Sequence, residues 1–127
     1  MLRTDFSDDA AWSAACAAML AETADGFRAY VDVVDDPSFA SLGLEEILAA
    51  TVAGYDWSFL IVADHLTMTD EAHPFLVVDL AHERGRSFRA LPREIQGIEN
   101  NLSIANMDFR DFADSADGDG VFRGFAR

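Results

Sequence analysis

The chain has 127 residues, half of them hydrophobic, which is enough for one buried core and too few for two stable domains. Its 23 acidic residues outnumber its 9 basic residues, and the formal net charge is −14. A negative surface repels nucleic acids and anionic membranes, so we expect neither as a direct partner. We predict a single domain over residues 1–127, for which a cation or a basic protein is the more compatible partner.

Cysteine content and hydropathy indicate a cytoplasmic protein. Because Cys16 is the single cysteine, the chain cannot form an internal disulfide. It contains no basic segment followed by an apolar run, as a signal peptide would, and no apolar stretch long enough to cross a membrane. We therefore expect a cytoplasmic protein without a membrane anchor.

The first half of the chain predicts a helix, a strand and a second helix. Ser7 is a suitable N-cap, and the apolar residues after it recur at helical spacing, namely Trp12, Ala15, Cys16, Met19 and Leu20. After a turn signal, residues 27–34 are rich in aromatic and β-branched side chains, which favours a strand. A short helix is expected over residues 44–50 and should end at Gly54.

The second half predicts three strands followed by two helices. Short apolar runs separated by polar turns favour an antiparallel meander over residues 57–63, 74–81 and 86–91. The first connection, residues 64–73, is expected to be a long loop. From Pro92 to Asn106 the apolar period is helical, and another helix should run from Asn106 or Asp108 to the turn that starts at Asp117.

Together these elements predict an α+β fold. We expect about four strands in a mainly antiparallel sheet, with the N-terminal helix and the two C-terminal helices packed mostly on one face. A doubly wound parallel fold is disfavoured because three consecutive strands lack helical crossovers. The last residues, 121–127, carry Phe122 and Phe125 and are expected to pack against the domain.

Asp79 and the arginines that follow it form the first candidate site. Asp79 interrupts the most apolar predicted strand, where a carboxylate could act as a general acid or base. It could equally cap a turn or pair with Arg86 or Arg89. These arginines, with Arg84 and Arg93, could bind a carboxylate or phosphate, although pairing with the surplus acids inside the domain is the simpler interpretation.

The second candidate site is the polar segment from Asn100 to Asp108. Asn100, Asn101 and Asn106 have only moderate helix propensity, so a sequence selected for a helix alone would rarely contain them. They could donate hydrogen bonds to a partner's backbone. Alternatively, they cap the junction between two helices, which is the interpretation we favour.

No motif predicts a metal, a cofactor or a catalytic residue. His65, His73 and His82 lie at strand ends near acidic residues, but their spacing matches no metal-ligand pattern, and ordinary turn residues are the simpler interpretation. Residues 117–120 resemble part of a calcium loop that would start at Ser115, yet Ala126 stands where that loop needs glutamate. We predict neither a metal site nor a cofactor.

Several runs of this sequence resemble a family of small acidic domains of unknown function from actinobacteria. The resemblance spans nearly the whole chain, and the runs that carry it are residues 1–6, 33–37, 59–64, 75–80, 99–109 and 119–125. It implies a stand-alone cytoplasmic domain. No activity is assigned to the family, so the resemblance transfers no catalytic role.

From these observations we predict a non-enzymatic interaction protein, most plausibly an immunity- or inhibitor-type module that binds a basic protein partner. Its size, its −14 charge and the lack of a catalytic motif favour this function, because acidic inhibitors use charge complementarity to steer association. The alternative is a small enzyme or ligand-binding domain with a site at Asp79, Arg86, Arg89 and the segment 100–108. Both a monomer and a homodimer are compatible with the sequence.

Overall fold

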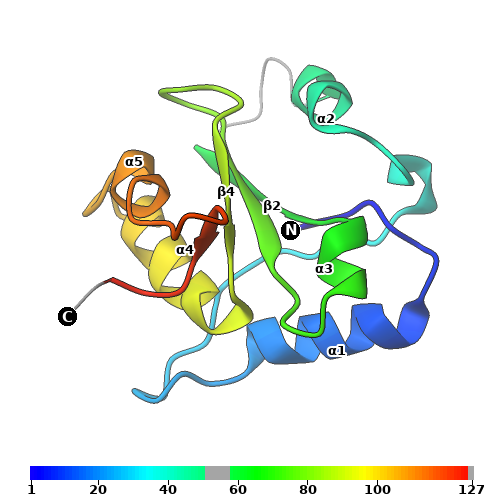
Figure 1. Ribbon diagram of the computed structural model, residues 1–127, viewed down its shortest axis with the longest axis horizontal. Coiled ribbons are helices and arrows are strands. Elements are labelled where there is room, and N and C mark those ends of the chain that lie inside the picture. Colours follow the sequence, from blue (N-terminus) through cyan, green and yellow to red (C-terminus); the bar gives the residue numbers. More distant parts are fainter. Residues whose placement is uncertain (51–57, 126–127) are drawn as a thin grey trace.

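The computed structural model describes residues 1–50 and 58–125 of this chain, which form an α+β fold around a five-stranded mixed sheet (Figure 1). The strands are β1 (Leu2–Arg3), β2 (Phe59–Ala63), β3 (Phe75–Asp79), β4 (Ser87–Ala90) and β5 (Val121–Phe122). Their spatial order equals their chain order. β2, β3 and β4 form the predicted antiparallel meander, whereas the short strands β1 and β5 pair in parallel with β2 and β4 at the two edges.

Five α-helices surround this sheet in the described residues. They are α1 (Asp9–Leu20), α2 (Leu44–Ala50), α3 (His65–Thr69), α4 (Ile95–Ser103) and α5 (Phe109–Ala113), and short 3-10 turns cover Pro37–Phe39 and Pro92–Glu94. The N-cap of α1 is Asp8, whose side chain accepts a hydrogen bond from the Ala11 N–H at 3.0 Å. The predicted cap, Ser7, is therefore wrong by one residue, because serine and aspartate are equally good N-caps.

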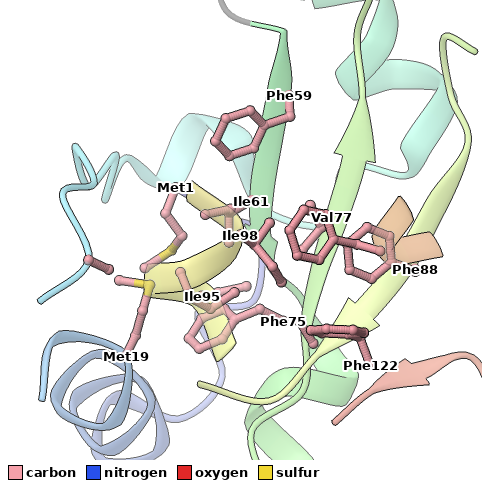
Figure 2. Close-up of a cluster of buried hydrophobic side chains, with 14 of the residues drawn as sticks. Met1, Met19, Phe59, Ile61, Phe75, Val77, Phe88, Ile95, Ile98 and Phe122 are labelled. Carbon is pink, nitrogen blue, oxygen red and sulfur yellow. The ribbon is translucent and has the colours of Figure 1, made fainter. Parts of the chain in front are cut away.

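Two hydrophobic clusters cover the two faces of the sheet. The larger cluster packs α1, α4 and α5 against one face, and Figure 2 shows Met19, Ile95 and Ile98 beside the strand residues Phe75 and Val77. The smaller cluster packs α2 against the opposite face. Alternate residues of each strand point to opposite faces, so β2 contributes to both clusters. The N-terminal and the two C-terminal helices thus share one face, as predicted.

Residues 27–34 do not form the predicted strand. Their β-pairing with the sheet is a single bridge between Val34 and Leu2. Ala29 is buried in the larger cluster, but the side chains of Phe27 and Tyr30 are 61% and 89% exposed. The physical reason is that β1 already lies beside β2, so the segment 27–34 reaches only the outer side of a two-residue strand. Most of the aromatic and β-branched side chains of this segment therefore stay exposed.

The predicted loop over residues 64–73 contains helix α3. Asp64 is its N-cap and forms a capping box with Thr67, a pattern that the sequence contains. The C-terminal helices are shorter than predicted, and the chain after them returns as β5. Two predicted boundaries, the helix end at Gly54 and the strand start at Trp57, lie outside the described residues.

Candidate functional site

Asp79 organises the turn between β3 and β4. Its carboxylate is 2% exposed and accepts hydrogen bonds from three backbone N–H groups, those of Ala81 (2.9 Å), His82 (3.3 Å) and Glu83 (2.8 Å). These bonds use both carboxylate oxygens within the hairpin itself. The geometry matches the turn-capping interpretation, and Asp79 forms no ion pair with Arg86 or Arg89.

This capping role makes a prediction about stability. Replacing Asp79 by alanine leaves three N–H groups without their acceptor, so we expect the free energy of unfolding to fall by about 1–2 kcal/mol. Asp79→Asn keeps one acceptor oxygen and should cost less. Urea denaturation of both variants measures the difference, and equal losses would contradict the capping role.

Arg89 on β4 pairs with Asp64, the residue that follows β2. Its two terminal nitrogens donate to the two carboxylate oxygens of Asp64 at 2.9 and 2.7 Å, and one of them also donates to the Pro74 carbonyl at 3.2 Å. Burial raises the pKa of Asp64, but the hydrogen bonds from Arg89 and Thr67 outweigh burial and hold that pKa below its usual value. Both terminal nitrogens of this guanidinium are thus engaged within the protein.

Arg86 lies before β4 and connects the hairpin to the end of α5. Its guanidinium pairs with Asp114 and, at 3.4 Å, with Glu83. The arginine is about one-third exposed, and its two partners are more exposed still. This is a surface ion-pair network, which is worth little stability in water.

The segment from Asn100 to Asp108 joins α4 to α5. Asn101 donates to the Gly97 carbonyl at 2.7 Å and accepts from the Asn106 side chain at 2.8 Å. Between them, Ala105 adopts a left-handed conformation with φ of 54°. The two asparagines therefore hold a tight turn closed, as expected for a helix junction.

Asp108 begins the second helix of this junction. Its side chain and that of Asp111 form a reciprocal capping box with the backbone at the start of α5. Asn100 is exposed, and its carbonyl accepts from the Ile104 N–H. The predicted site residues thus occupy three separate places: the β3–β4 hairpin, the Asp64–Arg89 pair and the α4–α5 junction.

A large apolar cavity lies elsewhere, at the edge of the sheet beyond β1. Its volume is about 550 Å³, and none of the seven predicted site residues lines it. Residues of β1 and β2 form one wall, residues 30–34 another, and α2 with the chain before it a third. Glu99 and Ser103 of α4 contribute to its polar part.

A second hollow, of about 560 Å³, opens beside β4 and β5. Arg89 is the predicted site residue that lines it, together with Arg123 and Asp119. The Arg123 guanidinium pairs with Asp117 and Asp119, each at 2.7 Å. Since both arginines of this hollow are already paired with carboxylates of the domain, these carboxylates largely neutralise its positive charge.

Arg3 is an organising residue that the sequence analysis missed. It is 3% exposed, stacks over the rings of Phe6 and Trp12, and pairs with Asp9 at 2.8 Å and Asp35 at 3.2 Å. An arginine preceded by two apolar residues and followed by several aspartates was the available signal. It joins the start of α1 to the segment after residue 34.

The histidines lie apart from one another. His65 pairs with Asp5 at 2.9 Å, and His73 bonds to the Thr67 carbonyl at 2.9 Å. Within residues 1–50 and 58–125, no three side chains of His, Cys, Asp or Glu come close enough together to hold a metal ion. No helix of the same residues is long and apolar enough to span a membrane.

The sequence of residues 1–125 matches the model of a protein family described as a domain of unknown function, DUF6924. The chain belongs to this family. This confirms the predicted resemblance to a domain of unknown function, and the match extends over nearly the whole chain. No curated protein matches this DUF6924 member.

Proposed function

We propose that this DUF6924 member is a non-enzymatic acidic interaction module that binds a basic protein partner, as immunity and inhibitor proteins do. The proposal is based on the ion pairs that the arginines form with carboxylates of the same domain. Within the described part of the chain, an ion pair with a carboxylate engages Arg3, Arg28, Arg86, Arg89, Arg93, Arg110 and Arg123. The surplus carboxylates are left to set the potential of the surface.

The acid density is high around the start of α1. There Asp9 and Asp35 pair with the buried guanidinium of Arg3, and Asp8 and Asp36 adjoin them in the sequence. We call these four aspartates the acidic patch. All four are exposed, and the Asp9 side chain is 91% exposed. One buried cation thus holds two aspartate-containing segments of the chain together. An exposed cluster of four aspartates suits a partner rich in lysine or arginine.

The alternative, an enzyme or ligand site built from Asp79, Arg86, Arg89 and residues 100–108, has less support. These groups make hydrogen bonds to their own neighbours and do not line a common cavity. A ligand that displaced them would have to break structural interactions first. The interaction module therefore remains the stronger proposal.

Charge removal from the acidic patch tests the proposal. A partner is first captured from the native host and purified, and its affinity is then measured calorimetrically at about 50 and about 500 mM salt. We expect the double variant Asp8→Asn/Asp36→Asn to bind about tenfold more weakly at low salt, because two negative charges of the patch are lost. Asparagine is also a good N-cap, so α1 and the 3-10 turn Pro37–Phe39 should stay capped.

The matched control is Asp25→Asn/Glu71→Gln, which removes two exposed charges away from the patch. This control should bind like the unaltered protein. Salt-independent affinity, or equal weakening by both double variants, would overturn the proposed role of the patch. If no specific basic partner is recovered at all, the interaction function itself is contradicted.

A further inference from the structure

The apolar cavity lies beside the part of β2 that does not pair with β1. Leu2 and Arg3 align with Val62 and Ala63, so among the described strands the first three residues of β2 have a neighbour only on the β3 side. In Figure 2, Phe59 and Ile61 lie along this part of β2 with Met1 nearby. Phe59, Leu60 and Ile61 of this unpaired edge all line the cavity.

The walls are fixed by the two cores of the domain. Phe59 and Ile61 belong to the cluster on one face, whereas Leu60 and Ile47 belong to the cluster on the other. Ile47 and Ile61 are 2% and 3% exposed, so the rest of the domain packs against them from behind. These buried residues give the cavity a packed wall, and its volume is within the range of small-molecule sites.

The electrostatics of the cavity favour a cation. Among the described residues that line it, the ionisable side chains that carry charge at neutral pH are Asp32 and Glu99, and no lining side chain is basic. The α-amino group of Met1 donates to the Asp32 carbonyl, but burial lowers its pKa to about 6, so it is largely neutral at pH 7. The net charge of −14 adds to this negative potential.

We infer that this cavity binds a small apolar amine, with its hydrocarbon body against the aliphatic walls and its ammonium group facing the carboxylates of Asp32 and Glu99. Ser103, whose hydroxyl donates to Glu99 at 3.3 Å, keeps a hydrogen-bonding group on the same side. Apolar anions such as fatty acids are disfavoured by the same charges. This binding site is independent of the acidic patch and of a protein partner.

Three probes with one bicyclic body and different head groups test the inference. The protein is titrated with 1-naphthylmethylamine, 1-naphthylmethanol and 1-naphthoate near neutral pH, and binding is followed by amide proton–nitrogen NMR spectra. We expect the amine to bind most tightly, the alcohol more weakly and the carboxylate not at all. The shifted signals should include those of Leu60, Ile61 and Ile47.

Two pairs of variants separate the apolar and the charged contributions. Val34→Trp fills a lining position and should weaken both binding probes at least tenfold, whereas Val33→Trp is the control, at a neighbouring position of similar exposure that does not line the cavity. Asp32→Asn/Glu99→Gln should weaken the amine about three- to tenfold and leave the alcohol unchanged. Asp25→Asn/Glu71→Gln should change neither.

Three results would overturn the inference. In the first, naphthoate binds as tightly as the amine, which removes the cation preference. In the second, the cavity is not the binding site: either no probe shifts the signals of the residues that line it, or Val33→Trp weakens binding as much as Val34→Trp. In the third, light scattering shows a dimer that Val34→Trp dissociates while no probe binds, in which case the occupant is a second copy of this chain.

Discussion

Replacing Phe75 by alanine should lower the free energy of unfolding by about 3–5 kcal/mol, the largest loss that we expect from a single substitution. Phe75 is fully buried on β3 and belongs to the cluster that joins the sheet to α1 and α4. Removing its ring leaves a cavity that these elements cannot close without moving. Urea denaturation followed by circular dichroism measures the loss directly.

The matched control is Phe27→Ala. Phe27 is 61% exposed in the segment that the sequence assigned to a strand, so its removal should change stability by no more than about 0.5 kcal/mol. The pair of variants compares the same chemical change in two environments. A loss at Phe27 comparable to that at Phe75 would show that residues 27–34 are packed as the predicted strand.

Asp64→Ala should lower the free energy of unfolding by about 2–4 kcal/mol, the second largest loss expected. The substitution removes the N-cap of α3 and also leaves the guanidinium of Arg89, which is 21% exposed, without its bidentate partner. If the pair acts as a unit, the double variant Asp64→Ala/Arg89→Ala should be less destabilised than the sum of the single variants. Strict additivity in this cycle would contradict the coupling.

The same carboxylate predicts a dependence on pH. The pKa of Asp64 is lower in the folded protein than in the unfolded chain, so its stabilising contribution is present above its unfolded pKa, about 4, and is lost as the pH falls through the folded pKa. The stability difference between the unaltered protein and Asp64→Asn should therefore shrink progressively below about pH 4. A difference that stays constant down to pH 2 would exclude this linkage.

The candidate sites show how far local sequence patterns extend. Asp79 was identified as an unusual carboxylate in an apolar strand, and the junction at Asn101 and Asn106 as a helix cap, because both depend on neighbours within a few residues. The partners of Arg89 and Arg3 could not be chosen in this way. Asp64 lies 25 residues before Arg89, and Asp35 lies 32 residues after Arg3, and an acidic chain offers many equivalent carboxylates.

The sequence by itself determined the α+β class, the meander of β2, β3 and β4, and the helices α1, α2, α4 and α5, because each has its own apolar period and breaking residues. Only the tertiary structure decided the edges of the sheet. β1 and β5 have two residues each, too few for a periodic pattern, and they exist as strands through pairing with β2 and β4. The exposure of Phe27 and Tyr30 and the position of the apolar cavity also depend on where distant segments meet.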